Sequence, residues 1–167
     1  MAQFHKKTAV DASLKSVWEF HSTGHGLLQL TPSILSPRID RIKPPNGPAH
    51  ADISQTLTEG TKIVLSVQPA VVGPRITWEA EITERNYTED QAHFIDIATN
   101  GLLPVWKHRH QFIAQDDTTV AIDHITYEPP PAVPTAFVRA GLSIGFVYRH
   151  HRLRSVFDAP SSVPDHK

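Results

Sequence analysis

Apolar and polar residues alternate along much of the chain, a pattern that predicts β-strands with one buried and one solvated face. The clearest alternation runs over 74–85, where Ile76, Trp78, Ala80 and Ile82 would share one face. Similar but weaker patterns predict strands over 3–10, 33–42, 61–68, 92–98, 105–114 and 119–128. Since most of these strands follow one another after short turns, we expect them to pair as an antiparallel sheet.

Helical spacing of apolar residues appears near both ends of the chain. Near the N-terminus, a short helix is expected after a cap at Asp11 or Ser13, and Gly24 and Gly26 would end it. A second short helix is expected over 27–30. Both helices would therefore lie between the first two strands of the sheet.

A long helix is expected over 135–157, after a loop that holds four of the chain's 14 prolines. Such a helix would cover the apolar face of the sheet. The expected fold class is α+β, a curved antiparallel sheet of six to seven strands wrapped around a long C-terminal helix, with two short helices after strand one. We expect residues 1–158 to form a single domain and 159–167 a polar C-terminal tail, because 167 residues favour one core.

Two adjacent predicted strands, 105–114 and 119–128, carry the histidine and aspartate residues that could bind a ligand or take part in catalysis. A two-residue turn at Asp116-Asp117 would fix their pairing by counting. This register places on the inner side of the sheet the pairs Trp106–Tyr127, His108–Ile125, His110–Asp123, Phe112–Ala121 and Ala114–Thr119. An imidazole and a carboxylate would then face each other on that side.

The pairing of His110 with Asp123 allows two interpretations. In one, the two groups satisfy each other inside the core, as buried polar groups must. In the other, they orient the polar end of a ligand, or His110 acts as a general base. The spacing His108-x-His110 also occurs in metal sites, but the sequence offers no obvious third ligand, since His124 falls on the opposite face. We therefore expect no metal and no other cofactor.

The long helix carries two neighbouring stripes at helical spacing. One stripe contains Leu142, Phe146, Arg149, Leu153 and Phe157, and the other contains Phe137, Gly141, Ile144, Tyr148 and His151. Gly141 and Gly145 lie one turn apart, and each costs about 1 kcal/mol relative to alanine in a helix interior. We therefore expect these glycines to allow close packing or to leave space for a cavity.

Composition excludes several kinds of partner. The net charge is -1, so there is no basic excess to attract nucleic acid. The chain has no cysteine, which excludes disulfides and thiolate metal sites and favours a cytoplasmic location. The N-terminal residues lack the apolar run of a signal peptide, and no segment has the apolar length of a membrane span.

Several short motifs, in their order along the chain, are typical of one protein superfamily. The most specific is Trp106-Lys107-His108-Arg109-His110-Gln111-Phe112. The others are Val17-Trp18-Glu19-Phe20, Leu30-Thr31-Pro32, Ile76-Thr77-Trp78, Phe94-Ile95-Asp96, Asp123-His124-Ile125-Thr126-Tyr127-Glu128-Pro129 and Phe146-Val147-Tyr148-Arg149-His150. In order and spacing the chain resembles the SRPBCC superfamily, the START-like, helix-grip proteins that include polyketide cyclases and plant-allergen relatives, and within it the small bacterial ligand-binding domains. The resemblance covers 4–157 and implies a hydrophobic pocket but no shared catalytic set. Relatives usually have Gly-Pro-aromatic where this chain has Gly101-Leu102-Leu103-Pro104, so the rim of the pocket would differ.

The expected function is the binding of a small, mostly hydrophobic molecule in a cavity between the sheet and the long helix. The cavity would be walled by Trp78, Phe94, Trp106, Phe112, Ile125, Tyr127, Phe137, Ile144 and Tyr148. The polar groups that orient the ligand would be His108, His110, Asp123 and Asp96. Two alternatives remain open: an enzyme of the cyclase or dehydratase type, with His110 as base and Asp123 behind it, or a protein with a filled core that acts through its surface.

Overall fold

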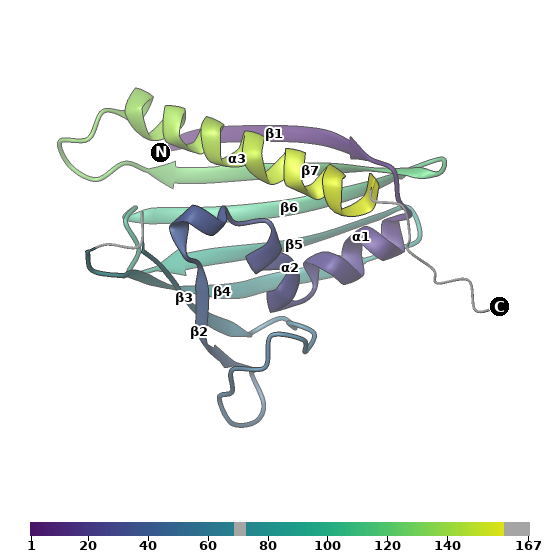
Figure 1. The fold of residues 1–167 in the computed structure, drawn as a ribbon, viewed down its shortest axis with the longest axis horizontal. Helices are drawn as coiled ribbons and strands as arrows, with labels where there is room; N and C mark the ends of the chain where they lie inside the picture. Colours follow the sequence, from purple (N-terminus) through teal and green to yellow (C-terminus); the bar gives the residue numbers. More distant parts are fainter. Residues whose placement is uncertain (69–72, 159–167) are drawn as a thin grey trace.

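A computed structural model describes residues 1–68 and 73–158, and the expected polar tail over 159–167 lies outside the described residues. Within them, seven strands form one antiparallel sheet in the order β1-β7-β6-β5-β4-β3-β2 (Figure 1). The strands are β1 (Ala2–Val10), β2 (Arg38–Lys43), β3 (Lys62–Val67), β4 (Ile76–Tyr87), β5 (Gln91–Thr99), β6 (Val105–Gln115) and β7 (Thr118–Glu128). The first strand therefore pairs with the last, and the other neighbours follow chain order. This confirms the expected antiparallel sheet.

Three α-helices complete the described fold: α1 (Leu14–His21), α2 (Gly24–Gln29) and α3 (Thr135–Asp158). Ser13 caps α1, because its side chain accepts a hydrogen bond from the backbone N–H of Ser16. One expectation needs correction, since the strand predicted to begin at residue 33 starts at Arg38. A short 3₁₀ helix, Ser33–Leu35, takes up the preceding residues because the backbone turns sharply at Ser36, whose φ is 42°.

The glycines at 24 and 26 do not simply end the first helix; they begin the second one. Thr23 caps α2 through a hydrogen bond from the backbone N–H of Gly26 to its side-chain oxygen. A Cβ added to Gly26 would lie 1.9 Å from the carbonyl oxygen of Phe20, so only glycine fits there. The close approach lets α2 begin directly after α1 and fold back against its end.

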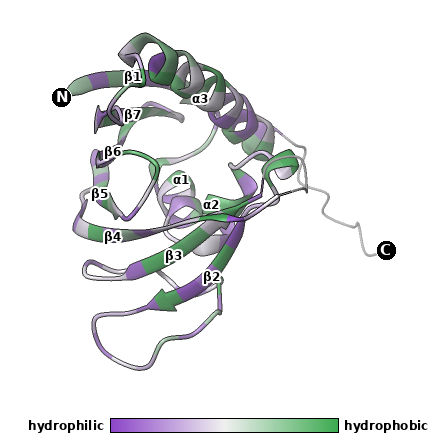
Figure 2. Cartoon of the chain, turned by 90° about the vertical axis from the view of Figure 1, so that its left-hand side faces the viewer, coloured by the Kyte–Doolittle hydropathy of each residue, from purple (hydrophilic) through white to green (hydrophobic). Residues whose placement is uncertain are grey.

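The sheet curves, and the helices fill its open side. Figure 2 shows the strands bending from β1 at one edge to β2 at the other, with α3 over the β1 edge and the two short helices inside the curve. Irregular pairing between Ile39 and Arg41 and between Ile82 and Glu84 adds local bends, as β-bulges do. Because α3 covers only part of this curved face, side chains of the two short helices also pack against the sheet there.

Apolar side chains pack in three groups along this inner face. One group joins α1 to the sheet around Val10, Val17 and Phe112, with Leu153 from the end of α3. A second lies under β2, β3 and β4, and a third packs Phe146 of α3 against Ile125 and Tyr127 of β7. None of the described helices is long and apolar enough to cross a membrane.

The β6–β7 hairpin has the register that counting from the turn predicts. Trp106 pairs with Tyr127, His108 with Ile125, and His110 with Asp123. The turn residue Asp116 has a φ of 51°, a left-handed conformation suited to a two-residue hairpin turn. The two histidines therefore point to the inner face, as expected, and both are buried.

Candidate functional site

A pocket of about 480 Å³ lies between the inner face of the sheet and α3. Strands β3 to β6, the part of α3 from Val138 to Arg149, and the loop between β5 and β6 form most of its wall. Its lining is mainly apolar, with Leu65, Trp78, Phe94, Leu103 and Trp106 among its residues. A space of this size lies within the usual range for small-molecule sites, about 300–1,000 Å³.

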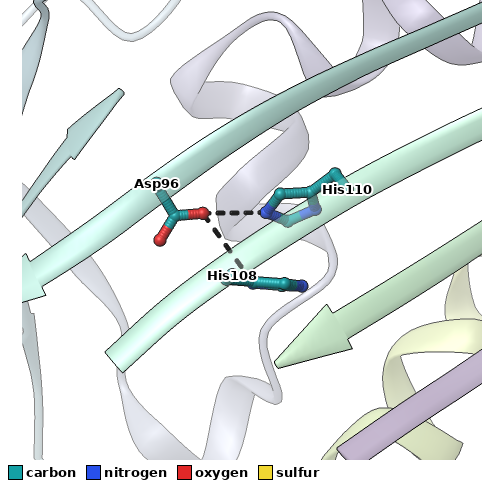
Figure 3. Close-up of side chains that lie close together, drawn as sticks. All are labelled: Asp96, His108 and His110. Atoms are coloured by element: carbon teal, nitrogen blue, oxygen red, sulfur yellow. Dashed lines mark hydrogen bonds and ion pairs between the residues drawn. The ribbon is translucent and has the colours of Figure 1, made fainter. Parts of the chain in front are cut away.

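One wall of the pocket is polar. Asp96 of β5 lies directly opposite His108 of β6, and His110 follows two residues later on the same face. Figure 3 shows both imidazole rings beside the Asp96 carboxylate. His110 Nε2 lies 2.9 Å from Asp96 Oδ2, and His108 Nδ1 lies 3.8 Å from the same oxygen. All three side chains border the pocket.

Asp123 of β7 lies behind this wall and does not border the pocket. Its Oδ1 accepts a hydrogen bond of 2.7 Å from His108 Nε2, and its Oδ2 accepts one of 2.7 Å from His150 Nε2 of α3. His110 Nδ1 lies 3.2 Å from Oδ1, and Arg149 Nε lies 3.8 Å from Oδ2. His110 and Asp123 do face each other as predicted, but the carboxylate is shared by four groups, and its two shortest bonds go to His108 and His150.

The charges in this cluster follow from its contacts. Burial alone would raise the pKa of Asp123, but hydrogen bonds from His108, His110 and His150 hold that pKa well below its usual range. Asp96 is half-buried, which would raise its pKa, yet a hydrogen bond from His110 keeps that pKa low. Burial opposes protonation of His110, but the two carboxylates outweigh it and raise its pKa. His108, buried beside His110, has a lowered pKa.

A consistent protonation state results from these shifts. The lowered pKa values of Asp96 and Asp123 favour ionised carboxylates, the raised pKa of His110 favours its protonated form, and the lowered pKa of His108 favours its neutral form. Because an ionised carboxylate only accepts hydrogen bonds, His108 donates Nε2–H to Asp123, which leaves its Nδ1 as a lone-pair acceptor. That nitrogen lies on the side of the ring nearer to Asp96.

His21, at the end of α1, adds a further imidazole to the pocket wall. Its Nδ1 lies 2.8 Å from the backbone oxygen of Val17, so the ring donates to that oxygen. Burial, and then the nearby charge of Arg149, lowers the pKa of His21 to about 3. His21 is therefore neutral at physiological pH.

Five of the predicted site residues border the pocket: Trp78, Phe94, Trp106, His108 and His110. Asp96, expected as an additional polar group, borders it as well. Phe112, Ile125 and Tyr127 are buried in the neighbouring apolar groups rather than in the pocket wall. Asp123 belongs to the polar cluster one layer further from the pocket.

Three residues of the long helix that were predicted to line the pocket do not line it. Phe137 is 74% exposed, Ile144 is 75% exposed, and Tyr148 is also exposed. The reason is the rotation of α3 about its axis: the stripe that contains Leu142, Phe146 and Leu153 faces the sheet, so these three side chains of the neighbouring stripe face solvent. The pocket instead meets α3 at Val138, Gly141, Leu142, Phe146 and Arg149.

Sequence reasoning did not assign His21, Arg149 or His150 to the site. Arg149 and His150 lie in a basic segment that is equally well explained by the helix dipole. A signal was present, however, because His150 follows Phe146 by four residues and precedes Leu153 by three, which places it on the same buried face. His150 is indeed only 3% exposed.

Compared by sequence, the chain matches no protein-family model and no curated protein. Solved structures do match. A START superfamily protein from Mycobacterium smegmatis has a TM-score of 0.64 at 13% identity, over 93% of this chain and 97% of that chain. A protein from Chromobacterium violaceum has a TM-score of 0.67 at 11% identity, with 93% and 96% covered, and one from Arthrobacter aurescens has 0.68 at 15% identity, with 99% and 92% covered. The chain therefore has the START-like, helix-grip fold, as the sequence resemblance predicted.

Proposed function

We propose that the chain binds a small, mostly apolar molecule in the pocket between the sheet and α3. The observation that carries this proposal is the combination of a largely apolar lining with polar groups gathered on one wall, the usual make-up of a small-molecule site. The START superfamily protein among the similar structures supports the same kind of function.

The polar wall would orient the ligand. Asp96, His108 and His110 border the pocket from the sheet, and Arg149 borders it from α3. Burying these groups against a purely apolar molecule would leave donors and acceptors without partners, which is costly. We therefore propose a ligand with one polar end, placed against this wall, and an apolar body placed between Trp78, Leu103 and Trp106.

A second candidate is acid catalysis on the bound molecule. One observation favours it: His110 borders the pocket, and the two neighbouring carboxylates raise its pKa. A protonated imidazole in this position could donate a proton to a ligand atom and recover it afterwards. This corresponds to the cyclase or dehydratase alternative, with His110 as the acid rather than the base.

The two glycines of α3 allow a controlled test of the binding proposal. Gly141 borders the pocket and Gly145 does not, and an added Cβ would meet no atom within 4 Å at either position. Gly141→Trp should place an indole at the pocket and weaken the binding of an environment-sensitive fluorescent dye at least tenfold. Gly145→Trp, with the same change of residue one turn away, should leave dye binding unchanged.

Native mass spectrometry of protein from its own host provides a second measurement. We expect a co-purified small molecule with the unsubstituted chain and with Gly145→Trp, and its loss with Gly141→Trp. Equal dye binding by both variants, or dye binding only under unfolding conditions, would contradict the proposed pocket function.

A further inference from the structure

We propose that Asp96, His108 and His110 form a binding site for one divalent transition-metal ion at the polar wall of the pocket. Each residue offers one ligand atom, and these atoms all lie within 4.8 Å of one another. Among residues 1–68 and 73–158 this is the single group of three or more such residues with that geometry. The absence of a third ligand was the reason for expecting no metal, and Asp96 of the adjacent strand supplies that ligand (Figure 3).

The three ligand atoms are close to the arrangement that an ion requires. Metal–ligand bonds of about 2.0–2.1 Å in a tetrahedral site place neighbouring ligand atoms about 3.3 Å apart. Asp96 Oδ2 lies 2.9 Å from His110 Nε2 and 3.8 Å from His108 Nδ1, distances on either side of that value. Shifts of about half an ångström would bring these two separations to that value, and the ligand atoms of His108 and His110 also lie within 4.8 Å of each other.

The protonation and orientation of His108 also suit a ligand. Its Nε2–H donates to Asp123, so the nitrogen that remains free for coordination is Nδ1, on the side of Asp96. In protein metal sites, a ligating imidazole commonly donates its other N–H to a carboxylate, which fixes the ring and raises its basicity. Asp123 is in turn held by His150 through a 2.7 Å hydrogen bond, so this support reaches back to α3.

His110 is the residue that would change most when the ion binds. It lies between two carboxylates, with Nε2 2.9 Å from Asp96 Oδ2 and Nδ1 3.2 Å from Asp123 Oδ1. A cation bound by His110 Nε2 and Asp96 would occupy the place of the hydrogen bond that now joins them. The cluster would keep a positive charge between its carboxylates, which limits the electrostatic cost of the exchange.

The donor set indicates the class of metal. Two imidazole nitrogens and one carboxylate oxygen, without thiolate, suit zinc, iron(II), cobalt(II) and similar ions rather than calcium or magnesium. Three protein ligands leave at least one coordination position for water or a ligand atom. That position would face the pocket, because all three side chains border it. This inference does not depend on the binding of an apolar molecule, since the ion is held by protein atoms alone.

The test is a titration of the chain, without a polyhistidine tag and after treatment with a chelator, with cobalt(II) alone. We expect one cobalt ion per chain, with visible absorption bands of a four- or five-coordinate site, and displacement of cobalt by zinc. Asp96→Asn keeps the size of the side chain but removes its charge, and His108→Gln keeps an N–H that can donate to Asp123 but removes the imidazole lone pair. Each should weaken cobalt binding at least tenfold.

His124→Ala is the matched control. His124 lies on the same hairpin but on the opposite face, where its ring stacks on that of His5. This variant should bind cobalt with unchanged affinity and spectrum. The inference is overturned if the unsubstituted chain binds no cobalt at millimolar concentration, if His124→Ala removes binding, or if Asp96→Asn and His108→Gln, shown by circular dichroism to be folded, bind as tightly as the original chain.

The failure of the metal site can be distinguished from the failure of the proposed binding function. Dye binding by the metal-free chain, together with no cobalt binding, would overturn the metal site and leave the pocket function intact. Cobalt binding that depends on Asp96, with no dye binding and no effect of Gly141→Trp, would leave the metal site and contradict the apolar ligand.

Discussion

His150 of α3 and Asp123 of β7 are joined by a hydrogen bond of 2.7 Å in the buried interior of the molecule. The other oxygen of the same carboxylate accepts a hydrogen bond from His108 of the pocket wall. One side chain therefore links the long helix to the sheet and also fixes an imidazole that borders the pocket. Changes at Asp123 should accordingly affect both the stability of the fold and the shape of the polar wall.

We predict that Asp123→Ala strongly destabilises the protein. The change leaves His108 and His150 without their shared acceptor and His110 without one of its two carboxylates. Removing one partner of such a buried charged cluster typically costs about 3–5 kcal/mol. The free energy of unfolding, measured by urea denaturation at pH 7, should fall by this amount. Asp117→Ala, at an exposed turn position, should change it by less than about 0.5 kcal/mol.

A double-mutant cycle should show that His150 and Asp123 act together. His150→Ala alone removes the helix end of the hydrogen bond, and once Asp123 is also alanine there is no bond left to lose. The double variant should therefore be less destabilised than the sum of the single changes, by about 1–3 kcal/mol. The same non-additivity is expected for His110 with Asp123, which lie 3.2 Å apart. Simple addition in both cycles would show that the carboxylate does not hold these groups.

His21 should make stability depend on pH. Its folded pKa of about 3 lies below the ordinary value of 6.5, because burial and then Arg149 disfavour its charged form. Below pH 6.5 the unfolded chain takes up a proton at His21 that the folded chain does not, so stability falls as the pH falls from about 6.5 towards 3. One such proton corresponds to about 1.4 kcal/mol per pH unit.

The variant His21→Phe isolates this effect. It keeps an aromatic ring against Phe112 but cannot take up the proton. The difference in unfolding free energy between the variant and the original chain should shift by about 1.4 kcal/mol per pH unit in favour of the variant as the pH falls from 6 to 4. All other titrating groups are present in both proteins, and a constant difference over this range would mean that His21 is protonated in the folded state.

Two glycines in helices should respond in opposite directions to alanine. Gly26→Ala places a Cβ 1.9 Å from the backbone oxygen of Phe20, which cannot move without shifting α1, so we expect a loss of about 3 kcal/mol. Gly145→Ala meets no atom within 4 Å and should stabilise α3 by roughly 0.5–1 kcal/mol. Thermal denaturation of the two variants checks both signs. A stable Gly26→Ala protein would mean that α2 does not approach α1 this closely.

The alternation of polar and apolar residues was sufficient to predict the sheet and the inner face of the β6–β7 hairpin, and the helical spacing of apolar residues was sufficient to predict the long helix. The register of that hairpin, and with it the position of His110 opposite Asp123, follows from the turn at Asp116-Asp117 alone. These features are local: they depend on the two-residue period of a strand and on the number of residues in a turn. The sequence therefore carries them without any knowledge of the rest of the molecule.

The rotation of α3 could not be predicted in the same way. Its two stripes are similarly apolar, and Phe137 and Ile144 would be as suitable for burial as Leu142 and Phe146. Which stripe faces inward is decided by how the helix meets the β1 edge of the sheet, where Phe146 packs beside Phe4. The expectation for Phe137, Ile144 and Tyr148 was wrong for this reason.

The partners of the polar groups were likewise decided only in three dimensions. Within one hairpin, counting pairs His110 with Asp123, but Asp96 comes from β5 and His150 from α3, and the two residues are 54 positions apart in the chain by their numbers. Hydrogen bonds depend on contacts of a few ångströms, and periodicity within one element gives no distance to another. The sequence by itself determined the strands, the long helix and the inward histidines; the curvature of the sheet and the docking of α3 decided which carboxylates those histidines meet and which side chains surround the pocket.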